Sequence, residues 1–208
     1  MHFGGLNAKI YAMRKKLLTR DNYSALCSGT TVFSDYSYFS DFCDDYARLR
    51  LYVREPVYRD FLDAVFASGE KDLKYHLRVW KKIKNLDNEN RRILTRLKGT
   101  EIHIENALRG YRLKKYYALP EAQVYAHLIP VRHPPVEPFF INENFPERDA
   151  KMYMKKWYKH EARLHPRTLA VLLDYAFNKQ NETHNLNTIR EGRRRGLTTE
   201  RIFEYLWL

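Results

Sequence analysis

The residues of this sequence whose types come closest to metal chemistry are His160, Glu161 and His165. Two histidines on one helix can share a zinc ion only when both lie on the same face, as residues four positions apart do. His160 and His165 are five positions apart. At ~100° per residue they lie about 140° apart around a helix. The spacing therefore predicts no metal site at this pair.

Other patterns typical of active sites are not found in the sequence. None of its eight glycines belongs to a G-x-x-x-x-G-K phosphate-binding loop. Spacing alone assigns no Ser-His-acid or Cys-His arrangement. We interpret His103 and His184 as histidines at helix contacts or at the solvent edge. The sequence thus predicts a protein that is not an enzyme and needs no cofactor or metal.

Basic side chains are the remaining candidates for a binding function. The net charge is +12, from 37 basic and 25 acidic residues, which favours nucleic acid, an anionic membrane surface or an acidic protein as a partner. Any single basic run has a structural explanation, since cations at a helix C-terminus contribute ~0.3–1 kcal/mol each. Together the runs indicate an acidic partner. We assign its interface to two runs, Arg109, Arg112, Lys114 and Lys115 in the first and Arg190, Arg193, Arg194 and Arg195 in the second.

Both runs lie inside a repeated sequence unit. The first copy lies in Gly99–Leu128, a looser copy spans Asn185–Leu206, and a fainter echo spans Arg14–Leu26. In each copy an amphipathic helix ends in positive charge, and a tight break precedes a short helix with an acid in its first turn. Thr19 and Thr198 have the residue type and position of N-caps. The repetition predicts helical lobes that share a core.

Asn106 and Asn185 begin the corresponding part of the two clearer copies. Asparagine is a poor residue for a helix interior. We therefore interpret both side chains as hydrogen-bond partners of a neighbouring helix end.

Hydrophobic periodicity elsewhere in the chain is helical, and no useful β alternation occurs, so the predicted fold class is all-α. A long helical pattern begins at Asp72, and we expect Gly99 to interrupt it. Five of the eight prolines lie between Pro130 and Pro146, which indicates a connector. The expected organisation is N-terminal and central helical lobes in 1–129, a Pro-rich connector in 130–148 and a C-terminal helical lobe in 149–208.

Cysteine content and hydropathy bear on where the protein works. Cys27 and Cys43 are too few for a disulfide scaffold or a four-thiolate metal site, which favours a reducing, cytoplasmic setting. The N-terminus lacks the apolar segment of a signal peptide. No apolar run approaches the ~20 residues needed to cross a bilayer. Any membrane association is therefore expected to be peripheral.

Three segments, in order along the chain, resemble the V-type ATPase subunit d family, whose members in bacterial and archaeal V/A-type ATPases are known as the C subunit. They are Asn7–Leu26, Leu86–Val131 and Pro166–Leu206. The resemblance implies an all-helical, funnel-like protein of three related lobes. It also implies a non-catalytic coupling protein that sits on the membrane ring of proteolipids, the c-ring, at the cytoplasmic face. Such a protein receives the foot of the rotor shaft and transmits torque for proton or sodium transport.

The sequence also departs from the pattern of that family. The chain is shorter than typical members and resembles them least from His133 to Arg163, so a partial funnel is expected. His103 and Gln180 stand where the family usually has acids, and Pro120 replaces an N-cap serine at ~1 kcal/mol of local helix stability. Two alternatives stay open. One is a basic helical nucleic-acid-binding protein, which is less favoured, and the other is a divergent paralogue that acts as a helical scaffold.

Overall fold

The structure is a computed structural model that describes residues 3–31, 45–66, 73–130 and 146–208. The described residues form helices joined by turns and contain no β-strand, which confirms the all-α fold. Residues 45–50 are helical as well. The helices are α1 (Gly4–Arg14), α2 (Arg20–Ser28), α4 (Pro56–Phe66), α5 (Leu73–Ile83), α6 (Asn88–Tyr117), α7 (Glu121–Ala126), α8 (Pro146–Leu164), α9 (Ala170–Arg194) and α10 (Thr199–Glu204).

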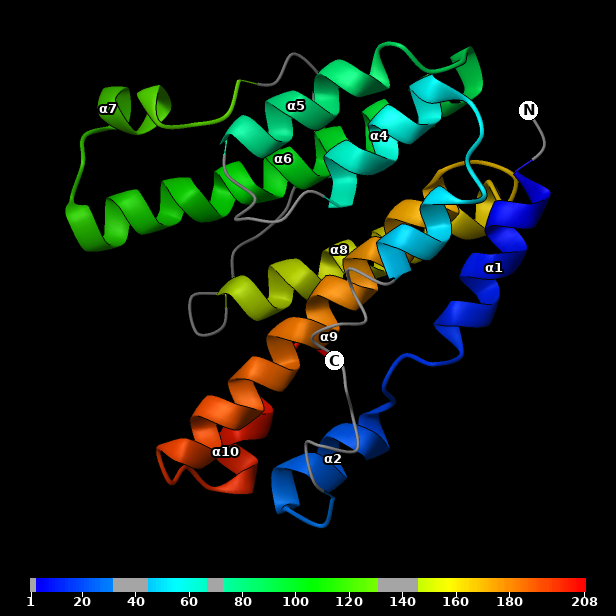
Figure 1. Cartoon of the computed structure of the whole chain (residues 1–208). Coiled ribbons are helices and arrows are strands. Elements are labelled where there is room, and N and C mark those ends of the chain that lie inside the picture. The colour runs from blue at the N-terminus through cyan, green and yellow to red at the C-terminus, as the bar shows by residue number, and fades with distance from the viewer. Residues whose placement is uncertain (1–2, 32–44, 67–72, 131–145) are drawn as a thin grey trace.

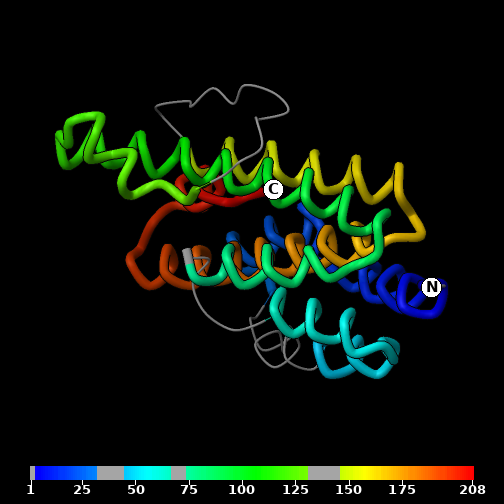
Figure 2. The backbone as a smooth tube through the Cα atoms, turned by 90° about the horizontal axis from the view of Figure 1, so that it is seen from above, coloured from blue at the N-terminus to red at the C-terminus, as the bar shows by residue number. Residues whose placement is uncertain are grey.

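Three long helices, α6, α8 and α9, form the centre of the molecule (Figure 1). Helix α8 packs against both α6 and α9. Helix α5 packs on α6, α4 packs on α5 and α9, and α1 lies along α9. Figures 1 and 2 show that α6 and α9 run in the same direction and that α8 runs against them. The C-terminal ends of α6 and α9 therefore point toward the same side of the molecule, although Figure 1 shows them well apart.

One apolar core joins helices from both sides of the expected connector. It includes Phe61 on α4, Leu94 on α6, Tyr158 on α8 and Tyr175 on α9, all buried. Burial of a large apolar side chain contributes ~1.5–3 kcal/mol, so this shared core provides most of the attraction between the helices. The division into 1–129, 130–148 and 149–208 stays a prediction about the sequence. Helix α8 begins at Pro146, inside the expected connector, and residues 131–145 lie outside the described residues.

The expected interruption at Gly99 is wrong. Helix α6 passes through Gly99 without a break, and the chain turns instead just before Asp87. The carboxylate of Asp87 caps α6 by accepting a hydrogen bond from the Asn90 amide at 3.0 Å, and the Tyr58 hydroxyl donates to the same carboxylate at 2.8 Å. A glycine inside a helix costs only ~0.5–1 kcal/mol, and the cap and the core packing of α6 offset that cost.

The sequence located the starts of the short helices correctly. The side chain of Thr19 accepts a hydrogen bond from the Asn22 amide and forms a capping box at the start of α2. Thr198 accepts from the Arg201 amide at 3.3 Å and caps α10. Pro120 occupies the N-cap position of α7 and provides no side-chain hydrogen bond there, as expected for proline.

Candidate partner interface at the ends of the long helices

Each of the long helices α6 and α9 is joined to a short helix by the same side-chain contact. The Asn106 side-chain amide donates to the Ile129 carbonyl at 2.7 Å, and its oxygen accepts from the Ile129 N–H at 2.8 Å. Asn185 makes the same pair of bonds with Trp207, at 3.3 Å and 2.8 Å. We call this pair of hydrogen bonds the asparagine clamp. It confirms that both asparagines bond a neighbouring helix end, and it defines two hairpins, α6–α7 and α9–α10.

The faint N-terminal echo of the unit does not form a third hairpin of this kind. The Asn7 side chain in α1 donates to the Pro166 carbonyl at 2.7 Å, far along the chain. Helix α2 packs on α9 and α10. A second apolar cluster, which we call the lower cluster, holds this arrangement together. It consists of Tyr23, Leu26 and Cys27 on α2, Leu186 and Ile189 on α9, and Ile202 and Leu206, which lie in or just after α10.

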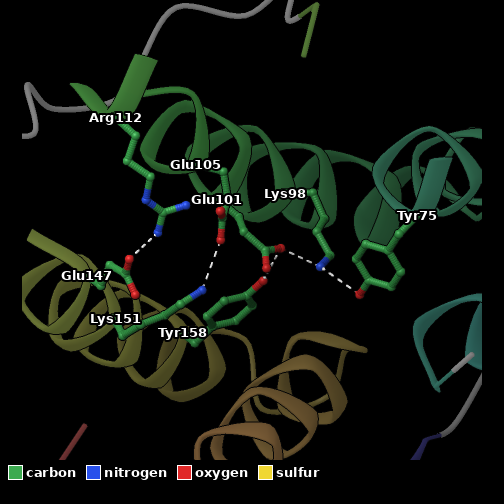
Figure 3. Close-up of polar contacts among 8 residues, drawn as sticks. All are labelled: Tyr75, Lys98, Glu101, Glu105, Arg112, Glu147, Lys151 and Tyr158. Atoms are coloured by element: carbon green, nitrogen blue, oxygen red, sulfur yellow. Dashed lines mark hydrogen bonds and ion pairs between the residues drawn. The ribbon is translucent and has the colours of Figure 1, made fainter. Parts of the chain in front are cut away.

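The first basic run combines internal contacts with exposed charge. Arg109 donates to the His127 carbonyl at 3.1 Å and so helps to close the α6–α7 hairpin. Arg112 forms an ion pair with Glu147 of α8 (Figure 3). The Lys115 ammonium lies 5.0 Å from the centre of the Tyr111 ring. Lys114 is exposed in the last turn of α6, and its side chain contacts no acid in the described part of the chain.

The second basic run is used more within the molecule. Arg193 donates to the Leu26 carbonyl at 3.5 Å, at the end of α2. Arg194 and Arg195 lie 2.9 Å and 4.0 Å from the Glu191 carboxylate. Arg190 donates to the Asn187 side chain at 3.3 Å. Exposed ion pairs of this kind contribute only ~0–1 kcal/mol, so an acidic partner can exchange them at little cost.

Helices α6 and α9 point toward the same side of the molecule, so both basic runs lie on that side, but Figure 1 shows the two helix ends well apart. The structure adds aromatic side chains that the sequence analysis did not assign to the interface. Tyr116, Tyr117 and Tyr125 are 65%, 70% and 64% exposed on the α6–α7 hairpin. Tyrosine and arginine are enriched at protein interfaces, where one end of the ring can stay wet. The Tyr116–Tyr117 pair, just before a helix break, was the available sequence signal.

A buried polar cluster fixes α6 against α5 and α8. The Lys98 ammonium donates to the Glu101 carboxylate and, at 3.4 Å, to the Tyr75 hydroxyl, while the Tyr158 hydroxyl donates to Glu101 at 2.9 Å (Figure 3). Burial alone lowers the pKa of Lys98, but the adjacent Glu101 carboxylate holds that pKa well above its ordinary value. Burial likewise raises the pKa of Tyr158. Lys98 is therefore charged and paired, which indicates a structural role.

Helix α9 contains a second buried Lys-x-x-Glu pair. The Lys179 ammonium lies 2.7 Å from the Glu182 carboxylate, which also accepts the Leu18 N–H at 2.7 Å. Burial raises the pKa of Glu182, while the bonds from Lys179 and Leu18 act in the opposite direction. The pair connects α9 to the turn before α2. The long helix of each hairpin thus contains a buried ion pair a few residues before its clamp asparagine. The sequence analysis did not identify these pairs because burial depends on distant helices.

His184 is confirmed as a histidine at a helix contact. Its ring stacks on Trp207, the residue held by the second asparagine clamp, with ring centroids 3.4 Å apart. Burial lowers the pKa of His184 to about 4, with Glu147 raising it and Lys151 lowering it further. The ring is therefore neutral at pH 7.

His160 and His165, whose spacing was compared with a zinc site, contact different side chains. His160 stacks on Trp157, and His165 lies 3.8 Å from Glu161. Among the described residues, no group of three or more His, Cys, Asp or Glu side chains is placed to hold a metal ion. Cys27 is buried in the lower cluster, and burial raises the pKa of its thiol to about 11, so it stays protonated near neutral pH. Cys43 lies outside the described residues.

Comparison with known proteins identifies the C-terminal region. Residues 136–205, about a third of the chain, match the model of the family described as ATP synthase (C/AC39) subunit. The match confirms the resemblance and supports a shortened or divergent member of that family. It includes most of His133–Arg163, the stretch expected to resemble the family least, so that expectation is wrong. The resemblance of the other two segments, Asn7–Leu26 and Leu86–Val131, to this family stays a prediction, because the matched residues do not include them.

Neither a comparison with curated proteins nor one with solved structures finds a match. The described helices include none with the length and apolar character needed to cross a membrane.

Proposed function

With a C-terminal region that matches the ATP synthase (C/AC39) subunit family as the premise, we propose that this chain is a coupling subunit of a V/A-type rotary ATPase. In this role it joins the central shaft to the proteolipid c-ring and has no catalytic function of its own. It lies at the cytoplasmic face of the membrane and is attached there through the c-ring. Torque passing through it couples ATP chemistry to proton or sodium transport.

The family match over residues 136–205 is the observation that carries this proposal. The matched region contains α8, α9 and α10, and therefore the whole α9–α10 hairpin with its second basic run. The α6–α7 hairpin repeats the clamp and has the first basic run at its own helix end, which points toward the same side of the molecule. A rigid helical surface with basic and aromatic side chains suits the coupling role, because charge orients a partner while apolar contacts hold it.

The proposed interface comprises the eight basic residues of the two runs, with Lys114 and Lys115 as the most informative members. Both lie in the exposed last turn of α6. Replacing both with glutamate reverses charge without touching the core. Lys156 and Lys159 on α8 are exposed and basic too, so the same change there is a matched control.

The test is affinity purification of the tagged full chain from mildly solubilised membranes, with mass spectrometry of the partners. We expect shaft, c-ring and catalytic-head subunits to be recovered together. The Lys114→Glu, Lys115→Glu variant should recover less of the shaft, and the Lys156→Glu, Lys159→Glu variant should behave as wild type. Clean recovery of the chain without any of these subunits would overturn the proposal.

The competing hypothesis, a basic helical nucleic-acid-binding protein, rests on the net charge of +12. It requires that affinity for duplex DNA fall with salt, with a slope of about −0.9 per neutralised phosphate in a log–log plot. A flat salt response, or no binding at low salt, would remove it.

A further inference from the structure

The two hairpins differ in what covers them. On α9–α10, helix α2 packs against both helices and completes the lower cluster. On α6–α7, the described part of the chain contains no helix in the corresponding place, and α7 packs on α6 (Figure 1). No described helix therefore occupies the position on α6–α7 that α2 occupies on α9–α10.

The asparagine clamps give the register in which the two hairpins are compared. Lys114 lies eight residues after Asn106, as Arg193 does after Asn185. The clamp partner of Asn106 is Ile129, and Tyr125 lies four positions before Ile129. Phe203 stands at the same distance before Trp207, and Leu128 and Leu206 each directly precede their clamp residue.

Equivalent apolar positions differ in exposure between the hairpins. Leu206 is buried in the lower cluster, and Phe203 packs against that cluster. Their equivalents on the other hairpin are more open, since Leu128 is only half-buried and Tyr125 is exposed. Within the described residues, the apolar face that α2 covers on α9–α10 is thus less covered on α6–α7.

The equivalent basic positions indicate the polarity and charge of that partner. Arg193 donates to the Leu26 carbonyl in the last turn of α2, where the helix dipole is negative. Lys114 stands at the same register position with an exposed ammonium group, and Lys115 follows it. A helix on α6–α7 with the orientation of α2 would bring its negative C-terminal end to these two lysines.

We propose that the α6–α7 hairpin binds an amphipathic helix of a partner protein, in the place that α2 takes on α9–α10. The apolar face of this helix lies on Tyr125 and Leu128, and its acidic C-terminal turn lies beside Lys114 and Lys115. Charge complementarity selects an acidic helix, and the chain's own α2 is already held in the lower cluster. The proposal deepens the proposed function and rests on it only for the identity of the partner, which would be a subunit of the rotary complex.

The test places a photo-crosslinking amino acid, p-benzoylphenylalanine, at position 125 of the full chain in its native cells. Tyr125 is exposed, so this replacement leaves the core untouched. Leu164, which is 57% exposed at the end of α8, is the control position. Crosslinked peptides are isolated and sequenced. We expect position 125 to crosslink one segment of another protein, with apolar residues every three to four positions and acidic residues at its C-terminal end, and position 164 not to do so.

Charge reversal then tests the orientation. Lys114→Glu with Lys115→Glu should lower the crosslinking yield from position 125 by about tenfold, because two attractive contacts with the helix end become repulsive. Lys114→Arg keeps the charge and should leave the yield unchanged. Lys156→Glu with Lys159→Glu should also leave it unchanged.

Several results would overturn the proposal. One is a crosslink from position 125 to this same chain, to lipid or to a segment without helical periodicity. Another is a crosslinking yield at position 125 that is no higher than at position 164. The last is a yield that does not change when the charges of residues 114 and 115 are reversed. The fate of the proposed function is separate. An acidic helix from a protein outside any rotary ATPase would support the docking surface and count against the coupling role. Recovery of the rotary complex without this crosslink would do the reverse.

Discussion

The α6–α7 and α9–α10 hairpins close through the same asparagine clamp but differ in how closely a glycine of the long helix approaches a side chain of the short one. A β-carbon added at Gly110 would meet Val124 of α7 at 3.6 Å, an ordinary contact. One added at Gly192 would meet Ile202 of α10 at 2.6 Å, which is too close for real atoms. The Ile202 side chain of α10 therefore packs directly onto Gly192 of α9, while Gly110 of α6 has room for a methyl group beside Val124 of α7.

This difference shows how one sequence unit can serve two purposes. The close approach of α10, together with α2, makes the second hairpin part of a closed apolar cluster. The first hairpin has the same clamp but keeps exposed tyrosines and an exposed lysine, Lys114. The clamp supplies the shape of each hairpin, and the surrounding helices decide whether its surface is interior or available for binding.

The largest effect is expected from the buried ion pairs inside the long helix of each hairpin. Replacing Glu101 with Gln leaves the Lys98 ammonium buried without a compensating charge and should lower the free energy of unfolding by about 3–5 kcal/mol. Glu182→Gln should act on Lys179 in the same direction. Urea unfolding followed by circular dichroism measures both.

A double replacement serves as the control for this prediction. Lys98→Met with Glu101→Leu removes both charges and should restore part of the stability, because the desolvation cost of the pair disappears while the buried Tyr158 hydroxyl loses its acceptor. A loss in Glu101→Gln of less than about 1 kcal/mol would show that the pair is not buried as described.

Removing each clamp should expose the difference between the hairpins. Asn185→Ala leaves the Trp207 N–H and carbonyl without their partner and should cost about 1–3 kcal/mol. Asn106→Ala should cost less, since Asn106 is only half-buried and water can replace it at Ile129. Hydrogen exchange at the Ile129 and Trp207 amides reports each hairpin separately. Equal losses from both variants would contradict the distinction between a closed and an open hairpin.

The two glycines should respond to alanine with opposite signs. Gly192→Ala forces Ile202 or the backbone to move and should cost about 1–3 kcal/mol. Gly110→Ala fits the available space and should stabilise the protein by about 0.4–1 kcal/mol through the lower entropy of the unfolded chain. Thermal unfolding of the two variants beside wild type gives the comparison. Stabilisation by Gly192→Ala would mean that α10 does not approach α9 as closely as described.

The smallest effect concerns pH and should fall on the second clamp alone. Because the pKa of His184 is lowered to about 4 from an ordinary value of 6.5, the unfolded chain takes up a proton at this residue before the folded protein does. The stability that this provides is complete above pH 6.5 and is lost as the pH falls toward 4. Between pH 7 and 5, exchange at the Trp207 amide should rise more than exchange at the Ile129 amide. His184→Gln should remove that difference.

Local sequence signals account for much of the fold. The caps at Thr19 and Thr198 and the role of Asn106 and Asn185 follow from preferences that act within one or two helical turns. The same local preferences gave a wrong prediction at Gly99. The weak tendency of glycine to interrupt a helix was overcome by the Asp87 cap and by packing on both sides of α6.

The sequence by itself determined an all-α chain, its short-helix caps and two hairpins with basic ends, since periodicity, caps and clamps depend on nearby residues. Only the tertiary structure decided that α2 covers one hairpin, that Arg193 is engaged with Leu26, and that Lys98 and Glu101 are buried together. These outcomes depend on apolar surfaces that meet across more than a hundred residues, or on helices that bury a pair already adjacent in sequence. No local pattern carries that information, because equivalent basic positions contact a neighbouring helix at Arg193 and stay exposed at Lys114.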